Sequence, residues 1–124
     1  MTKTNRGAAV VNKGVFRDEA EALDEVVRRL VETFDPESVW LFGSRAEGRA
    51  RPDSDFDLLL VAKPRGSFGS QDYERVIAPL IGLGVGCDVV PCSRDDFEEG
   101  TRIKTSLIAQ VLSSGRRLYD ATAH

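Results

Sequence analysis

The chain has 124 residues, 41% of them hydrophobic and 30% charged, which is ordinary for one globular domain with a real core. Its formal net charge of -3 argues against an extended nucleic-acid surface, because such a surface usually needs an excess of basic residues. No apolar run has the length of a membrane span, and neither the two cysteines nor the single histidine have the spacing of a zinc site.

The start of the chain is mostly polar. Its only apolar stretch, residues 8–11, is too short for the core of a signal peptide. We therefore expect a cytoplasmic protein whose cysteines are reduced and structural. Residues 1–17 contain glycine and show no periodicity, so we expect a flexible N-terminal arm there.

A helix is predicted from Asp18 to Phe34. Its apolar residues recur at spacings of three and four, which places them on one face: Leu23, Val26, Val27, Leu30, Val31 and Phe34. The helix should end at Asp35, because Pro36 disfavours helical geometry in the residue before it. We interpret this helix as scaffold.

The most informative stretch runs from Val39 to Val61. An apolar run at 38–42 predicts a strand that stops at a Gly-Ser turn, and a second apolar run predicts a strand over 55–61. Alternate side chains of a strand share a face, so Asp55 and Asp57 should project together, with Phe56, Leu58 and Leu60 in the core. Two neighbouring carboxylates repel each other, and a cation between them removes that cost.

The turn between these strands is suited to phosphate. Gly43 lets the backbone approach a ligand closely, and a helical turn over 45–50 would aim its first N–H groups, with the Ser44 hydroxyl, at phosphate oxygens. Arg45 is a weaker candidate for neutralising phosphate charge. Hard carboxylates beside such a turn indicate Mg²⁺ and a nucleoside triphosphate (NTP).

The rest of the chain alternates loops, helices and strands. We predict a loop over 63–70, either a linker or a flap over the nucleotide, and then a helix over 71–81. A strand over 86–90 carries Asp88 and should stop at Pro91. A short helix capped by Ser93, a helix over 105–112 and a strand over 117–119 complete the predicted elements.

This alternation favours a single small α/β (α+β) domain, with a mixed β-sheet flanked by helices. We place the domain at residues 18–120, between the N-terminal arm at 1–17 and a C-terminal tail at 121–124.

Gly43-Ser44, ten further residues and then Asp55-Phe56-Asp57 resemble the signature of the DNA polymerase β-like nucleotidyltransferase superfamily. The longer string from Gly43 to Val61 is similar to its small stand-alone members, the minimal nucleotidyltransferases, which often pair with a helical HEPN-domain partner. The resemblance implies the mixed sheet of the polymerase-β palm. It also implies a third carboxylate on a later strand, a position that Asp88 fits.

The function that this resemblance implies is transfer of a nucleoside monophosphate, AMP from ATP, to an acceptor hydroxyl. Asp55, Asp57 and Asp88 would be the catalytic and metal-binding residues for two Mg²⁺ ions, and Gly43, Ser44 and Arg45 would bind the nucleotide. Asp88 could also accept the proton of the attacking hydroxyl. The implied acceptor is a tyrosine on a HEPN-type toxin, which would make this chain an antitoxin. A second copy in a homo-oligomer is another source of an acceptor.

Three alternatives stay open from the sequence. The chain could be a non-catalytic module that binds nucleotide or neutralises a partner by complex formation. It could transfer nucleotides to a small molecule such as an aminoglycoside. It could also be a phosphohydrolase that uses the same metal ions.

Overall fold

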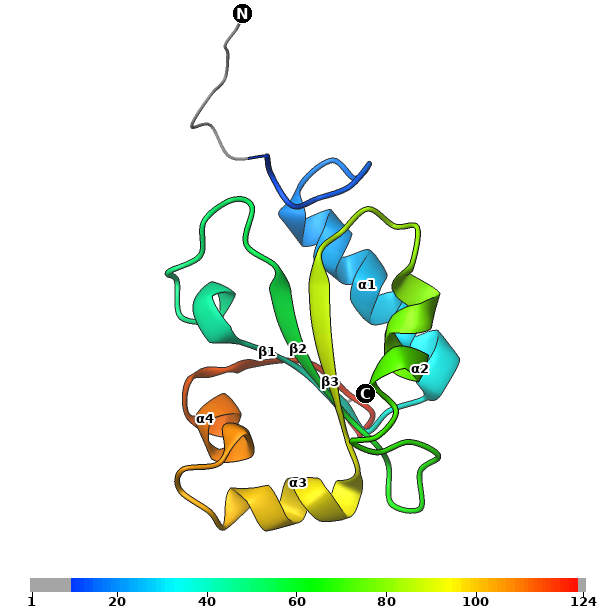
Figure 1. The fold of residues 1–124 in the computed structure, drawn as a ribbon, viewed down its shortest axis with the longest axis vertical. Coiled ribbons are helices and arrows are strands. Elements are labelled where there is room, and N and C mark those ends of the chain that lie inside the picture. Colours follow the sequence, from blue (N-terminus) through cyan, green and yellow to red (C-terminus); the bar gives the residue numbers. More distant parts are fainter. Residues whose placement is uncertain (1–9, 123–124) are drawn as a thin grey trace, which may run out of the picture.

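The computed structural model describes residues 10–122. One mixed sheet has the strand order β3-β2-β1-β4, and its strands are β1 (Ser38–Phe42), β2 (Phe56–Val61), β3 (Cys87–Cys92) and β4 (Arg116–Asp120). β1 runs antiparallel to both β2 and β4, whereas β2 and β3 are parallel. This arrangement confirms the predicted α/β fold with a mixed sheet flanked by helices (Figure 1).

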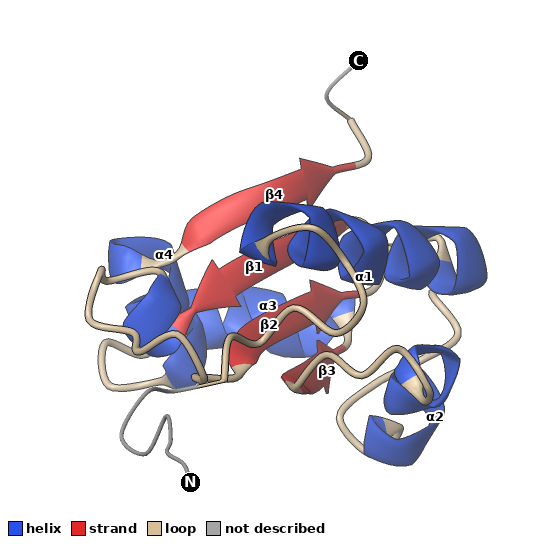
Figure 2. Cartoon of the chain, turned by 90° about the horizontal axis from the view of Figure 1, so that it is seen from above, coloured by secondary structure: helices blue, strands red, loops and turns tan. Residues whose placement is uncertain are grey.

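The helices form a layer on each face of the sheet. These are α1 (Glu19–Phe34), α2 (Tyr73–Ile77) with the 3-10 turn η2 (Ala78–Leu80), α3 (Arg94–Thr101) and α4 (Leu107–Ser114). Seen from above, α1 and α2 lie on one side of the strands, and α3 and α4 lie on the other (Figure 2). Ser93 accepts a hydrogen bond from the Asp96 N–H and caps α3, which confirms its predicted role.

β2 is buried on both faces, which explains its unbroken apolar run. On the α1 and α2 side, Phe56, Leu58 and Leu60 join the larger core, as predicted from their alternation. On the other side, Leu59 and Val61 pack with Val111 of α4 and the partly buried Phe97 of α3. The central strand therefore holds both helical layers in place.

The structure corrects the predicted end of β3. This strand continues through Pro91 to Cys92, and Leu60 and Val61 of β2 stand opposite these two residues. β3 is the edge strand of the sheet, where half of the N–H groups face away from the ladder, so a proline is tolerated.

Part of the expected N-terminal arm is tied to the body of the domain. The Asn12 N–H donates to the Pro52 carbonyl at 2.8 Å, and the Asn12 side chain bonds to Ser54 of the same loop and to Gly86 in the loop before β3. Phe16 packs against the larger core. The expectation of a loose arm therefore does not hold for this segment; residues 1–9 of that arm, and 123–124 of the predicted tail, lie outside the described residues.

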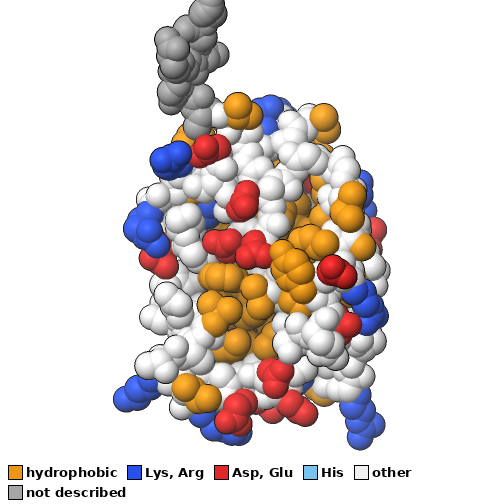
Figure 3. All heavy atoms as spheres, in the orientation of Figure 1, with side chains coloured by type: hydrophobic (Ala, Val, Ile, Leu, Met, Phe, Trp, Pro, Cys, Tyr) orange, Lys and Arg blue, Asp and Glu red, His pale blue; other side chains and the backbone are white. Residues whose placement is uncertain are grey.

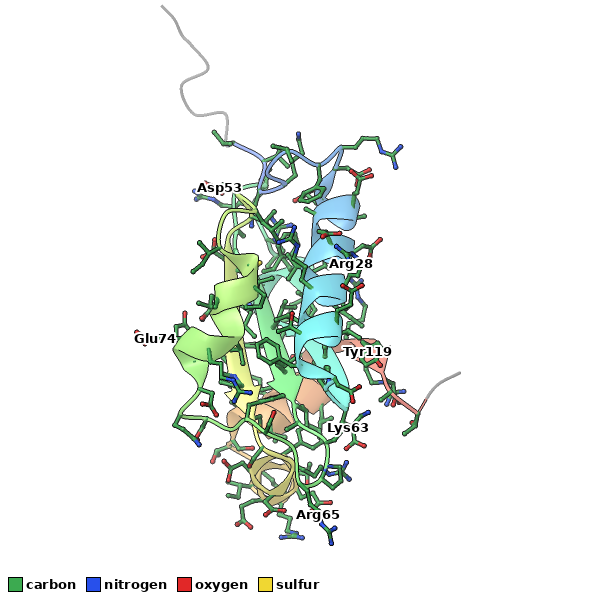
Figure 4. All side chains as sticks on the ribbon, turned by 90° about the vertical axis from the view of Figure 1, so that its right-hand side faces the viewer. Arg28, Asp53, Lys63, Arg65, Glu74 and Tyr119 are labelled. Atoms are coloured by element: carbon green, nitrogen blue, oxygen red, sulfur yellow. The ribbon has the colours of Figure 1, made fainter. Side chains whose placement is uncertain are left out.

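The loop over 63–70 belongs to the end of the sheet where β2 finishes. Phe68 is buried there, and its ring contacts Phe34 edge-on with centroids 5.8 Å apart. Figure 4 places Lys63 and Arg65 of this loop at the opposite end of the molecule from Asp53. Because Asp53 leads into the start of β2, these positions favour the linker interpretation over a flap on the nucleotide.

In the described part of the chain, no helix combines the length and apolarity needed to cross a bilayer.

Candidate active site

Three chain segments meet at one end of the sheet. β1 finishes there, and β2 and β3 begin there, because β1 is antiparallel to β2 while β2 is parallel to β3. The register places Asp57 opposite Phe42 on one side and opposite Asp88 on the other. The sequence signature is thereby folded into one location: the turn after β1, the aspartates that open β2 and the aspartate near the start of β3.

Asp57 is the electrostatic centre of this location. Burial raises the pKa of Asp57 above its ordinary value, and the negative charges of Asp88 and Asp55 raise it further. Within residues 10–122, the carboxylates of Asp55 and Asp57 accept no hydrogen bond and form no ion pair. Among the described residues, this negative charge is thus not compensated by a cationic side chain, which favours binding of a cation.

Two glycines make room for these carboxylates. A Cβ on Gly43 would overlap Asp57 Oδ2 and lie 3.3 Å from its Cγ. A Cβ on Gly86 would likewise overlap Asp55 Oδ1 and lie 3.3 Å from its Cγ. Gly43 also has a φ of +75°, in the left-handed region that glycine adopts without strain. Any side chain at these two positions would displace a carboxylate.

The residue before Asp55 is braced from two sides. The Ser54 carbonyl accepts hydrogen bonds from Arg45 Nε at 3.0 Å, from Arg45 Nη2 at 2.8 Å and from Asn12 Nδ2 at 2.9 Å. Asn12 also donates to the Gly86 carbonyl at 2.9 Å and accepts from the Gly86 N–H at 2.7 Å. Asn12 therefore joins the segment that leads into Asp55 to the segment that leads into Asp88.

Arg45, which was predicted to contact phosphate, makes contacts within the domain. Its Nη1 pairs with Glu19 of α1 at 2.6 Å, and its guanidinium lies 4.2 Å from the centroid of the Phe56 ring. Phe56 belongs to the core on the α1 side, so Arg45 is directed into that side of the domain. Only 10% of the Arg45 side chain is exposed, and its hydrogen bonds to the Ser54 carbonyl stabilise the loop before β2.

Ser44 lies in the 3-10 turn η1 (Gly43–Arg45), which replaces the predicted helical turn over 45–50. The Gly43 carbonyl accepts from the Glu47 N–H and the Ser44 carbonyl from the Arg49 N–H, so the turn is closed by its own backbone. The Ser44 hydroxyl has no hydrogen-bond partner within residues 10–122 and remains available to a ligand.

Tyr73 is a site residue that the sequence analysis missed. Its hydroxyl donates to Asp88 Oδ1 at 3.0 Å across the gap between α2 and β3. This hydrogen bond and the Asp88 charge raise the pKa of Tyr73 above its ordinary value. Asn12 was also missed, because it stands in a segment without periodicity and its partners, Ser54 and Gly86, are 42 and 74 positions away in the sequence.

Figure 3 shows acidic side chains gathered near the centre of one face, directly beside an apolar area. The partly buried apolar side chains on the α3 and α4 side of the sheet are Trp40, Phe42, Val90, Phe97 and Ile108. An acidic group next to apolar surface offers both a place for a cation and a place for a base or an acceptor side chain.

The donor set fits Mg²⁺ in its chemistry, because carboxylate oxygens are the ligands this ion prefers. Within the described residues, however, no three His, Cys, Asp or Glu side chains stand close enough to form a ready-made metal site. Asp88 accepts a hydrogen bond from Tyr73, while Asp55 and Asp57 accept none from the residues that the structure describes. Binding of a cation would therefore start from Asp55 and Asp57.

The fold and this arrangement define a nucleotidyltransferase. Residues 23–118 match the family model described as nucleotidyltransferase domain, and the chain belongs to that family. Among curated proteins, no sequence matches significantly.

Solved structures show the same fold at low sequence identity. A protein from Sulfolobus solfataricus, named as a nucleotidyltransferase, shares 23% identity at a TM-score of 0.55, over 79% of this chain and 77% of that one. A toxin-antitoxin structure with AMP-PNP shares 20% identity at a TM-score of 0.54, over 78% and 73% of the two chains. A mutant of the toxin-antitoxin MntA-HpeT shares 18% identity at a TM-score of 0.52, over 78% and 71%.

Proposed function

We propose that this chain is a Mg²⁺-dependent nucleotidyltransferase that moves AMP from ATP to the hydroxyl of a protein acceptor. The observation that carries the proposal is the meeting of Asp55, Asp57 and Asp88 at the end of the sheet where the turn at Gly43 also lies. Family membership supports nucleotidyl transfer as the reaction class. ATP is favoured as the donor because one structural neighbour was solved with AMP-PNP.

In this proposal, each residue of the site has a separate task. Asp55 and Asp57 would hold two Mg²⁺ ions, which would neutralise the triphosphate and stabilise the attacking and leaving oxygens. Gly43 and Ser44 contact the β and γ phosphates through the turn after β1. Asp88 orients the acceptor hydroxyl and takes its proton. Arg45 and Asn12 hold the loop that carries Asp55 rather than touching substrate.

A protein acceptor is favoured over a small molecule because the cavities described in the structure lie away from the three aspartates. Three cavities of the structure, of about 210, 380 and 320 Å³, are lined by residues other than the three aspartates. An acceptor side chain that belongs to another protein is positioned by that protein and needs no such cavity. Two structural neighbours are toxin-antitoxin proteins, so a toxin partner of the HEPN type, met in the cytoplasm, is part of the proposal.

The variant Asp88→Asn tests the reaction. It keeps the shape of the side chain and the Tyr73 contact but removes the base, so it should fold and bind ATP with Mg²⁺ while losing nucleotidyl transfer. Pyrophosphate release coupled to labelling of the acceptor is the readout, because hydrolysis alone would release pyrophosphate without label. Normal transfer by Asp88→Asn would remove Asp88 from the catalytic residues.

The competing function is a module that neutralises its partner by binding alone. The observation in its favour is that the three carboxylates do not form a ready-made metal site among the described residues. A pure binder would neutralise the partner in the presence of a chelator and without nucleotide. A transferase would need both Mg²⁺ and NTP.

A further inference from the structure

Tyr73 places a hydroxyl of this chain at the candidate active site. It is the first residue of α2, and its Oη donates to Asp88 Oδ1 at 3.0 Å. The residue is 46% exposed, so burial of the ring does not account for its position. Figure 4 shows the neighbouring Glu74 on the outer side of the same helix.

The helix that carries Tyr73 is firmly attached to the sheet. Val76, less than one turn along α2, is fully buried in the larger core. At the helix start, the Asp72 carbonyl accepts from the Val76 N–H at 3.0 Å, and the Asp72 carboxylate accepts from the Gly69 N–H at 2.8 Å. Tyr73 is thus held beside Asp88 by ordered structure on both sides of it.

This geometry meets one requirement of an acceptor, which is contact with the group that removes its proton. A general base must lie within hydrogen-bond reach of the proton that it removes, and the Tyr73 hydroxyl already donates to the carboxylate proposed for that task. Within residues 10–122, no other hydroxyl donates to Asp55, Asp57 or Asp88.

We propose that Tyr73 is a modification site at which this chain attaches a nucleoside monophosphate to itself, a step that rests on the proposed function. The Tyr73 oxygen forms a bond to the α-phosphorus of the NTP, and the bond from that phosphorus to the departing pyrophosphate breaks. The Tyr73 proton passes to Asp88, and pyrophosphate leaves. The product fills the position in front of Asp88, so a modified chain no longer transfers to other acceptors.

The test uses the purified full chain with Mg²⁺ and ATP labelled at the α-phosphate, and then each of the other three NTPs. We expect the intact mass to rise by one nucleoside monophosphate, with the label on the peptide that contains Tyr73. The label should disappear in Tyr73→Phe. The matched control is Tyr119→Phe, which alters the only other tyrosine of the chain, on β4, and should keep the label. Because the reaction is within one molecule, the labelled fraction at a given time should not depend on protein concentration.

Two results overturn the inference and leave the proposed function standing. One is a wild-type chain that releases pyrophosphate and labels another protein while Tyr73 stays unmodified. The other is a label on the chain that persists in Tyr73→Phe. Absence of both pyrophosphate release and label with all four NTPs, from a folded chain in lysate that contains its partner, would instead reject the proposed function together with this site.

Discussion

Gly43 offers a sharp test of how the turn after β1 supports the carboxylates. Replacing it by alanine adds a Cβ that would overlap Asp57 Oδ2. Gly48 provides a matched control, because its φ of +74° is almost identical to the +75° of Gly43, while nothing lies within 4 Å of a Cβ built on it. The two substitutions therefore share the backbone strain and differ in the contact with the carboxylate.

The expected changes in the free energy of unfolding and in the rate of transfer follow from this difference. An alanine in the left-handed region costs about 1–2 kcal/mol, so Gly43→Ala and Gly48→Ala should each lower the free energy of unfolding by roughly that amount. Only Gly43→Ala must also displace the Asp57 carboxylate. A displacement of about 1 Å at a reacting group lowers the rate on the order of 100-fold, so Gly43→Ala should lose about that factor in nucleotidyl transfer.

The assay combines urea unfolding with the initial rate of label transfer from α-labelled ATP. We expect both variants to unfold at lower urea concentrations than the wild type, whereas only Gly43→Ala should lose transfer. Equal rates in the two variants would refute the claim that the Gly43 turn positions Asp57.

Two further predictions concern residues around the site. Asn12→Ala removes three hydrogen bonds of about 0.5–1.5 kcal/mol each, so it should lower the free energy of unfolding by about 2–3 kcal/mol. The control Lys13→Ala loses one local hydrogen bond and should unfold near the urea midpoint of the wild type. A small effect of Asn12→Ala would show that the N-terminal segment does not brace the site. Burial and the Asp55 charge raise the pKa of Cys87 to about 12, so its thiol should react slowly with an alkylating reagent at neutral pH. Asp55→Asn should lower the pKa of Cys87 and speed its alkylation. Cys92 is the control, because burial and the Asp96 charge raise its pKa to about 11, and its alkylation rate should not change. Unchanged alkylation of Cys87 would show that the Asp55 carboxylate does not act on this thiol.

The parts of the fold that the sequence predicted are those encoded by local patterns. The sixteen residues of α1 follow a helical apolar period, and its predicted end before Pro36 is confirmed. The register of β1, β2 and β3 puts the Gly43 turn, Asp57 and Asp88 at one end of the sheet; the spacing of the motif pointed to the first two, and the family resemblance pointed to Asp88. Patterns of this kind depend only on neighbouring residues, which is why they can be recognised in one sequence.

The parts that could not be predicted depend on long-range contacts. Asn12 meets partners 42 and 74 residues away, and nothing in its own neighbourhood distinguishes it from an arm residue. Tyr73 reaches Asp88 only because α2 packs beside β3. Arg45 follows the Gly-Ser turn and was therefore a candidate for phosphate binding, but its direction is set by Glu19 of α1. The continuation of β3 through Pro91 likewise depends on its place at the edge of the sheet.

The most direct measurement is a labelling assay with α-labelled ATP, Mg²⁺ and the purified chain in lysate from the source cell. The control is the double variant Asp55→Ala/Asp57→Ala, checked for folding by circular dichroism. Nucleotidyl transfer at this site predicts a labelled protein that appears with the wild type, disappears with the double variant and is abolished by a chelator. Equal labelling by the wild type and the folded double variant would contradict the account, as would no labelling by the wild type with any of the four NTPs.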